Sequence, residues 1–486
     1  MFAPSGLDFT TKLPVSTILL YSKSYRNPAV YKISGGATIR NRAMKNEYSI
    51  RLLRMVIICN LYLIFYMSKF IIKGGKQLNG TWQVQGMKNA ATPVLAATLL
   101  TREQCFIHNI PRISDISHML EILEDLGSKV AWVDEHTVQI HTPEIKKHEM
   151  DYLLTKRMRS SVLCMGPLLA SIGNVLMPEP GGCNIGNRPL DAHFKAFEAL
   201  GAKVKFEQDK YYTINGKNLQ AGKIKLIEKS VTATENAMMA SSRLSGTTVI
   251  TNCAQEPHIM CLADFLRAIG VKVDGAGTNE IRITGSKDLK GCEFEIIPDQ
   301  LEVGTIAVLG ALCGGEIEIS PVVSEHMEVI KQKLDHAGVR VDEKAGTWIV
   351  RGSKNSLSAF EIKTEPYPGF PTDLQAPFGV LATQVKGNSV ICDPMYENRL
   401  AYMNELNKMG AKTVIKDEHT AEVEGPTDLK GADIHSLDLR AGATLIIAAL
   451  AAIGESVINE AEIIDRGYEK IDERLKALGA DIERVE

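Results

Sequence analysis

The sequence predicts an α/β protein whose body consists of two similar domains that together contain six repeats. Its 486 residues are too many for one ordinary hydrophobic core, so more than one domain is expected. The residues are 45% hydrophobic, 23% charged and only 6% aromatic, a composition that suits soluble α/β layers. A pattern of helix, glycine and strand recurs six times after Met67, and this recurrence is the main basis for the prediction.

The glycines of this pattern are spaced 68 to 74 residues apart. A glycine at the end of a helix adopts a left-handed conformation, after which the chain leaves as a strand. The six glycines are Gly127, Gly201, Gly270, Gly338, Gly410 and Gly479. A repeat of this length exceeds the roughly 20–50 residues of solenoid repeats, so we expect three repeats in each of two domains.

Most repeats contain a second helix made of small apolar residues, for example the helices after Asn89, Thr305 and Ala441. Because these helices are apolar on nearly all sides, they are expected to be buried. The helix before each glycine is amphipathic and is expected to cover the outside. The sequence therefore predicts domains with buried helices inside and sheets outside.

Residues 1–66 differ from the rest of the chain. They contain nine Lys and Arg against two Asp and Glu, whereas the remainder carries a net charge of −10. The apolar stretch 55–66 is shorter than the roughly 20 residues of a membrane span and has no signal-peptide cleavage site. We expect 1–66 to be an extension outside the fold, with membrane association of this basic segment as the alternative. The acidic body argues against a nucleic-acid partner.

The nine cysteines include no C-x-x-C pair and no Cys/His group with zinc spacing. Their scattered positions suggest a reducing, cytoplasmic environment rather than a disulfide framework. Most of them, such as Cys164 and Cys313 within apolar runs, are expected to be core residues. The sequence thus predicts no metal site.

A glycine-rich loop at residues 180–189 carries the strongest chemical signal. Its three glycines within six residues let the backbone turn sharply and approach a ligand. The thiol of Cys183, beside the cation of Arg188, is expected to have a lowered pKa and to act as an acid or nucleophile. The guanidinium of Arg188 suits a phosphate or a carboxylate. A surface turn with an incidental cysteine is the alternative, but it does not explain why Asp191 and His193 follow.

Cations precede several of the predicted helices, where unpaired N–H groups and the helix dipole favour an anion. Each one alone is often a solvated charge, but their equivalent positions in an acidic protein predict a shared anion site. These cations are Lys88, Lys156, Arg157, Arg159, Arg399, Arg440 and Arg466.

A proline-rich loop, residues 366–371, precedes Asp373 and restricts its backbone. A carboxylate held near several cations can act as a general base for a hydroxyl group. Capping of a helix by Asp373 is an equally supported alternative. Asp299 and Glu302 occupy the matching loop one repeat earlier.

Together these features resemble the UDP-N-acetylglucosamine 1-carboxyvinyltransferases, the enolpyruvyl transferases that open peptidoglycan synthesis. The resemblance runs from about Met67 to the C-terminus and implies two inside-out α/β barrel domains. It implies that residues 67–87 and 299–486 form a discontinuous first domain and residues 88–298 the second. The motifs that carry it are Gly86-x-Lys88-Asn89-Ala90-Ala91, the 180–193 loop, Ser230-Val-Thr-Ala-Thr-Glu-Asn236, Phe370-Pro-Thr-Asp-Leu-Gln375, Tyr396-Glu-Asn-Arg-Leu400, Asp438-Leu-Arg440 and Ile464-Asp-Arg-Gly-Tyr-Glu469.

The resemblance implies transfer of the enolpyruvyl group of phosphoenolpyruvate to the 3-hydroxyl of UDP-N-acetylglucosamine, with release of phosphate and without a metal or cofactor. Cys183 would be the general acid, which in this family also forms a covalent adduct with phosphoenolpyruvate, and Asp373 the base. The residues matched to phosphoenolpyruvate are Lys88, Arg188 and Arg466 for its phosphate and Arg399 and Arg440 for its carboxylate. The residues matched to the UDP-sugar are Asn89, Arg159, Pro189, Leu190, Asp191, Ser230, Val231 and Met395.

Two positions depart from the family pattern: Thr232 stands where glycine is usual, and Gln300 where arginine is often found. The shikimate-pathway enolpyruvyl transferase is an alternative with the same fold, but it lacks the glycine-rich loop that contains Cys183. A UDP-sugar-binding regulator without catalytic activity is a second alternative, although every matched catalytic position is filled.

Overall fold

The computed structural model describes residues 68–182, 185–186, 188–207, 211–352 and 356–486, and the short segments 31–32 and 38–39. The chain separates into two units, 1–67 and 68–486. In the first unit the described residues are β1 (Tyr31–Lys32) and β2 (Thr38–Ile39), which pair antiparallel. Among the described helices none is long and apolar enough to cross a membrane. The apolar stretch 55–66 lies outside the described residues.

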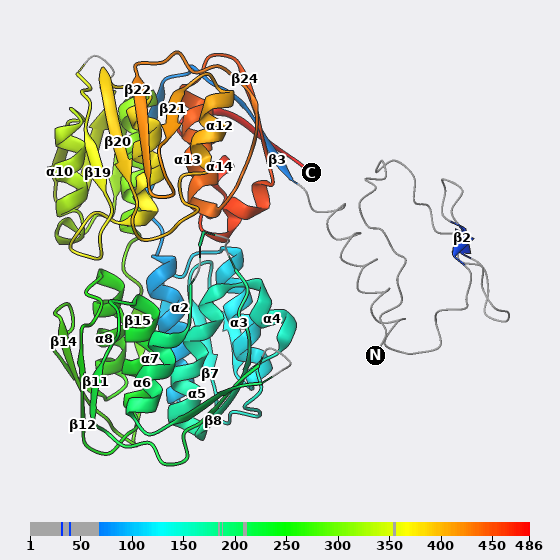
Figure 1. The fold of residues 1–486 in the computed structure, drawn as a ribbon, viewed down its shortest axis with the longest axis vertical. Coiled ribbons are helices and arrows are strands. Elements are labelled where there is room, and N and C mark those ends of the chain that lie inside the picture. The colour runs from blue at the N-terminus through cyan, green and yellow to red at the C-terminus, as the bar shows by residue number, and fades with distance from the viewer. Residues whose placement is uncertain are drawn as a thin grey trace. The chain divides into compact units, whose positions relative to one another are not determined.

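The described part of 68–486 contains six sheets, one for each predicted repeat (Figure 1). Three of them are made by residues between 104 and 295. In spatial order their strands are β15 (Glu293–Glu295), β5 (Gln104–His108), β7 (Val138–His141) and β6 (Lys129–Trp132); β8 (Asn174–Pro178), β10 (Tyr211–Asn215) and β9 (Lys203–Phe206); and β11 (Lys223–Lys225), β12 (Thr247–Thr251), β14 (Glu280–Thr284) and β13 (Lys272–Asp274).

The other three sheets are made by residues after 313, and two of them also contain a strand from residues 69–83. Their strands are β17 (Val341–Lys344), β18 (Thr347–Arg351), β16 (Gly314–Ser320) and β4 (Leu78–Gln83); β19 (Glu361–Lys363), β20 (Gly387–Cys392), β22 (Thr420–Gly425) and β21 (Lys412–Ile415); and β23 (Asp433–His435), β24 (Glu455–Asn459), β3 (Lys69–Lys73) and β25 (Asp481–Val485). In each four-stranded sheet an antiparallel set of three strands is extended by one parallel strand.

Helices of small apolar residues lie inside these sheets, as the sequence predicts, and all 14 residues of the longest, α9, are buried. These inner helices are α2 (Lys88–Ala97), α5 (Met165–Ile172), α7 (Val231–Ser241), α9 (Gln300–Cys313), α11 (Gln375–Ala382) and α13 (Leu439–Ala451). The other short helical segments are η1 (Thr98–Leu100), α4 (Tyr152–Arg157), η2 (Arg159–Cys164), η3 (Ser324–His326), η4 (Thr372–Leu374) and η5 (Ala461–Arg466).

The predicted amphipathic helices are followed by the six glycines, whose φ angles of 83° to 115° confirm the left-handed ends. They are α3 (Ser114–Leu126), α6 (Asp191–Ala199), α8 (Pro257–Ala268), α10 (Glu328–His336), α12 (Tyr402–Lys408) and α14 (Ile471–Ala477). Cys164 and Cys313 are buried, which confirms their expected place in the core.

The first two strands of the second unit, β3 and β4, pair with strands from the C-terminal part of the chain. β3 lies between β24 and β25 and pairs antiparallel with both, and β4 pairs in parallel with β16. We call residues 88–298 the N half, and β3, β4 and residues 299–486 the C half. The exact domain boundaries within this arrangement stay a prediction.

Gly166 allows α5 and α7 to pack closely. Its N–H donates to Asn236 Oδ1 at 2.7 Å, and a Cβ added at Gly166 would lie 2.6 Å from the carbonyl oxygen of Asn236. We therefore expect Gly166→Ala to lower the free energy of unfolding by about 1–3 kcal/mol, because the helices must separate. Gly222→Ala is the control, since its added Cβ meets its nearest atom at 3.9 Å. Equal urea stability of the two variants would contradict this account.

Candidate active site

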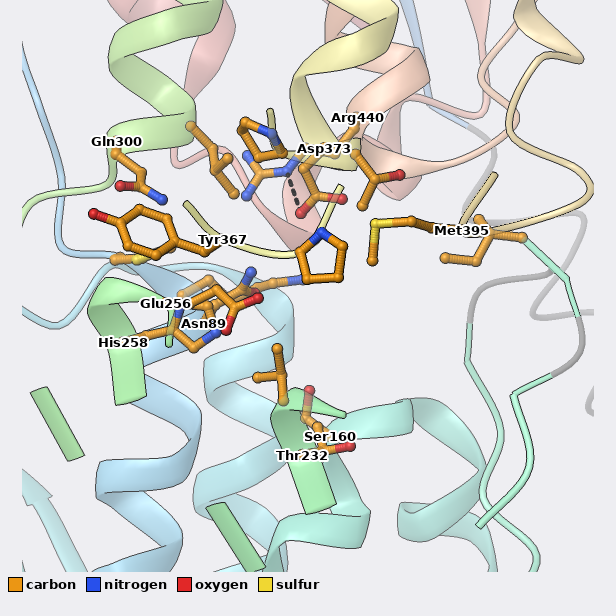
Figure 2. Close-up of a pocket in the computed structure, with 18 of the residues that line it drawn as sticks. Asn89, Ser160, Thr232, Glu256, His258, Gln300, Tyr367, Asp373, Met395 and Arg440 are labelled. Carbon is orange, nitrogen blue, oxygen red and sulfur yellow. Dashed lines mark ion pairs between the residues drawn. The ribbon is translucent and has the colours of Figure 1, made fainter. Parts of the chain in front are cut away.

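A cleft of about 250 Å³ opens between the two halves, at the point where several inner helices begin. Its lining comes from the starts of α2, η2, α7, α9 and α13 and from the loops around η4 and η5. Figure 2 shows part of this lining, with Asn89 and Thr232 of the N half facing Asp373 and Arg440 of the C half. The predicted residues that the structure brings together here are Lys88, Asn89, Arg159, Arg188, Val231, Asp373, Met395, Arg399, Arg440 and Arg466.

The remaining predicted residues lie beside this cleft. A second groove shares Arg159 and Arg188 with it and is lined also by Pro189, Leu190 and Asp191. Ser230 does not line either hollow but caps α7, where its hydroxyl accepts from the Ala233 N–H at 3.4 Å. Cys183 lies outside the described residues.

A buried carboxylate, Asp115, joins two of the predicted cations from opposite halves. Its side chain, 3% exposed, lies 3.1 Å from Lys88 Nζ and 2.9 Å from Arg466 Nε. Burial alone would raise the pKa of Asp115, but the charges of Lys88 and Arg466 outweigh it and hold the pKa below its usual value. Asp115 therefore stays ionised and holds both cations at the cleft.

Asp373 is paired with cations and does not cap a helix, so the capping alternative is wrong. It lies within η4, forms an ion pair with Arg399 Nη2, and lies 3.6 Å from Arg440 Nε. Burial would raise the pKa of Asp373, but Arg399 and Arg440 lower it well below its usual value. The cleft thus holds an ionised carboxylate between two guanidinium groups.

The two arginines next to Asp373 still have donors to offer. Arg440 is 3% exposed and lies beside the ring of Tyr468, but among the described residues none of its three nitrogens meets an acceptor in good hydrogen-bond geometry; its carboxylate neighbours, Asp299 and Asp373, lie at 3.5 and 3.6 Å. Nε of the buried Arg399 also lacks a hydrogen-bond partner within the described chain. Buried donors without partners are rare, and here they fit a missing anion.

Asp393 positions the loops that carry Asp373 and Met395. Its buried carboxylate accepts hydrogen bonds from the hydroxyls of Thr364 and Thr372, at 2.8 and 2.5 Å, and from the Met395 N–H at 3.1 Å. The hydrogen bond from Thr372 fixes the residue next to Asp373. No sequence signal identified Asp393, because its partners come from three separate segments.

The described part of the glycine-rich loop rests against the C half. The Asn398 N–H donates to the Ile185 carbonyl at 3.3 Å, and the ring of Tyr396 lies 5.7 Å from the guanidinium of Arg188 and 5.6 Å from that of Arg399. Burial and the neighbouring Arg188 lower the pKa of Arg159 to about 10, so Arg159 remains a cation at neutral pH. The cleft is therefore closed on this side by contacts between the halves.

The structure separates the other candidates from the cleft or gives them new roles. Lys156 and Arg157 make surface ion pairs with Glu179 and Glu121, at 3.4 and 2.5 Å. Glu302 fixes the end of β4 and the residues just after it. Its carboxylate accepts hydrogen bonds from the Gln85 N–H at 2.8 Å and from Trp82 Nε1 at 3.1 Å.

The departure at position 232 is accommodated by a neighbouring side chain. The Thr232 hydroxyl lies 3.0 Å from Nε2 of the buried His193.

Among the described residues, the group of three acidic or histidine side chains close enough to hold one metal ion is Glu135, His136 and Glu469. This group does not line the cleft.

Proteins similar in sequence to this chain are carboxyvinyltransferases. Residues 72–475 match the family described as EPSP synthase (3-phosphoshikimate 1-carboxyvinyltransferase), and the chain belongs to this family. It is 45% identical over 421 residues to UDP-N-acetylglucosamine 1-carboxyvinyltransferase 2 of Carboxydothermus hydrogenoformans, covering 86% of this chain and the whole of that protein. It is 44% identical over 419 residues to UDP-N-acetylglucosamine 1-carboxyvinyltransferase 3 of Caldanaerobacter subterraneus subsp. tengcongensis, with 86% and 100% coverage.

Solved structures show the same fold. The enolpyruvyl transferase NikO from Streptomyces tendae matches with a TM-score of 0.79 at 23% identity, over 86% of this chain and 99% of that one. EPSP synthase from Acinetobacter baumannii matches with a TM-score of 0.66 at 20% identity, over 86% and 100%. The predicted fold class and family are thereby confirmed.

Proposed function

We propose that the chain transfers the enolpyruvyl group of phosphoenolpyruvate to the 3-hydroxyl of UDP-N-acetylglucosamine and releases phosphate, the first committed step of peptidoglycan synthesis. The observation that carries this proposal is the cleft itself, which cations from both halves line and in which Arg399 and Arg440 flank the carboxylate of Asp373. The scattered cysteines support a cytoplasmic location for this reaction.

The cations divide into two groups that suit the two anionic ends of phosphoenolpyruvate. Lys88 and Arg466, joined by Asp115, would hold the phosphate together with Arg188. Arg399 and Arg440, whose unpartnered donors lie beside Asp373, would hold the carboxylate. Charges placed in advance in a closed cleft stabilise the negative charge that develops during the reaction.

The UDP-sugar would enter from the side of the second groove. Pro189, Leu190 and Asp191 line this groove, Arg159 and Arg188 connect it with the cleft, and the start of α7 offers N–H groups for the diphosphate. Asn89 and Met395 would contact the sugar, with its 3-hydroxyl at Asp373.

The reaction would proceed by addition and elimination. The 3-hydroxyl attacks C2 of phosphoenolpyruvate and gives its proton to Asp373, while C3 receives a proton from the Cys183 thiol. In the second stage phosphate leaves from C2 and C3 loses a proton, which restores the vinyl group. Binding of the phosphoenolpyruvate carboxylate would draw Arg399 and Arg440 away from Asp373 and so raise the basicity of its carboxylate.

The test is phosphate release from phosphoenolpyruvate with two alternative acceptors. We expect release that depends on UDP-N-acetylglucosamine and none that depends on shikimate 3-phosphate. Release with shikimate 3-phosphate alone would assign the chain to the sister reaction that the family description names. Binding of UDP-N-acetylglucosamine without release would instead indicate a regulatory protein.

The role of Cys183 is tested by mass spectrometry. After incubation with phosphoenolpyruvate, we expect a peptide containing residue 183 to gain the mass of one phosphoenolpyruvate molecule. The Cys183→Ser variant should show no gain, whereas Cys392→Ser should keep it. A gain on another cysteine would contradict the assignment.

A further inference from the structure

The cleft continues past Asp373 into a polar lobe to which the proposed reaction gives no role. We define the polar lobe as Glu235, Glu256, His258 and Gln300. The first three belong to α7 and the start of α8 in the N half, and the last begins α9 in the C half. Figure 2 shows Glu256, His258 and Gln300 on the other side of Asp373 from Met395.

Each side chain of the polar lobe has a buried atom without a hydrogen-bond partner among the described residues. Glu235, His258 and Gln300 are only 1%, 5% and 6% exposed. The unpartnered atoms are Glu235 Oε1, Glu256 Oε2, His258 Nδ1 and Gln300 Oε1. Native proteins rarely leave buried polar atoms unpaired, so four of them in one part of a cleft indicate a missing ligand.

The spacing and charge of the polar lobe favour a neutral ligand over a metal ion. The ligand atoms of Glu235, Glu256 and His258 do not come close enough together to hold one ion, in contrast to the group at Glu135. Burial raises the pKa of Glu235 and of Glu256, and it lowers the pKa of His258 to about 4. Hydroxyl groups suit such a lobe, because they both donate and accept hydrogen bonds.

We propose that the polar lobe binds the 4- and 6-hydroxyl groups of the acceptor sugar. This inference rests on the proposed function, which places the 3-hydroxyl at Asp373 and the diphosphate near Arg159 and α7. In the pyranose ring, C4 and C5 form the edge opposite C1 and C2. A sugar held at C1 by its diphosphate and at C3 by Asp373 therefore presents its 4- and 6-hydroxyl groups along a further edge, where the polar lobe lies.

The polar lobe then explains how the protein selects its sugar. Buried polar atoms that are satisfied only by substrate hydroxyls reject an analogue that lacks them, because the atoms would stay unpaired. Gln300, which departs from the family pattern, would then be one of the residues that hydrogen-bond to the sugar hydroxyls and determine which sugar binds.

The test measures binding of UDP, of UDP-N-acetylglucosamine and of its 4-deoxy and 6-deoxy analogues by titration calorimetry. We expect at least one deoxy analogue to bind the unmodified protein fivefold or more weakly than the parent sugar nucleotide. Gln300→Met and Glu256→Gln should each weaken the parent sugar nucleotide about fivefold and leave UDP within twofold. They should also reduce the difference between parent and analogue, which a purely structural change would not do.

Glu424→Gln is the control, because Glu424 forms an exposed ion pair with Lys412 at 2.7 Å on the C-half surface. Deoxy analogues that bind the unmodified protein as tightly as the parent would overturn the polar lobe as a sugar site. So would Gln300→Met and Glu256→Gln variants that weaken the binding of UDP and of the sugar nucleotide equally. If the unmodified protein binds neither UDP nor UDP-N-acetylglucosamine, the proposed function itself fails as well.

Discussion

Replacing Asp373 by Asn is expected to lower kcat for sugar-dependent phosphate release by about 10²–10⁴-fold, the usual effect of losing a general base. Asparagine has nearly the shape of aspartate but cannot take the proton of the 3-hydroxyl. The KM for phosphoenolpyruvate should not rise, because Arg399 and Arg440 lose a competing carboxylate and stay available to the substrate. Steady-state kinetics with each substrate varied will separate these two effects.

Asp342→Asn is the matched control for this variant. Asp342 also pairs with an arginine of the C half, Arg351, but at the surface, with both side chains about half exposed. The control should keep its activity and its stability. If Asp373→Asn lost stability but kept kcat, Asp373 would be a counterion for the arginines and not the base.

The Asp115→Asn variant is expected to lose about 3–5 kcal/mol of unfolding free energy, because it leaves Lys88 and Arg466 without their shared charge. The kcat/KM for phosphoenolpyruvate should fall at least about tenfold, since neither cation is then held at the cleft. Urea unfolding and initial-rate kinetics measure the two effects. Asp125→Asn on the same helix is the control, because its pair with Lys147 is part-exposed and should contribute less than about 1 kcal/mol.

The contribution of Asp115 also depends on pH in a defined direction. Its pKa in the folded protein lies below the value of about 3.9 that an unfolded chain has, so its stabilisation is fully present above that value. It is lost as the pH falls through the folded pKa. The stability difference between the unmodified protein and Asp115→Asn should therefore be constant near neutral pH and shrink below about pH 4. A difference that grew on acidification would contradict the ion pairs.

The fold could be predicted from the sequence because its signals are local. A helix of small apolar residues, a glycine and an alternating strand each identify one element, and six copies identify the architecture. The glycine that ends each amphipathic helix is required by its positive φ, so it appears in the sequence at each equivalent place. The pairing of β3 with β24 and β25 left no such signal in those strands, since partners separated by nearly 400 residues have no common pattern.

The cations of the site could be found because they stand next to predicted helix starts. Their carboxylate partners could not, since Asp115 is 351 residues from Arg466 and precedes no recognisable motif. Glu235 and His258 were missed for a related reason: within a helical pattern each resembles an ordinary residue of an amphipathic or buried helix. Only the structure shows that their unpartnered atoms lie along the same cleft as Asp373.

The position of β3 determines the order in which the protein can be completed during synthesis. β3 leaves the ribosome before almost all of the fold, yet β24 and β25, its partners on both sides, are the last strands to be made. Until then it has two open edges, which are a template for wrong pairing. The N half can form its three sheets in the meantime from its own residues. The C half must wait for its final residues, so a nascent chain stalled before residue 455 should hold a finished N half beside an open C half.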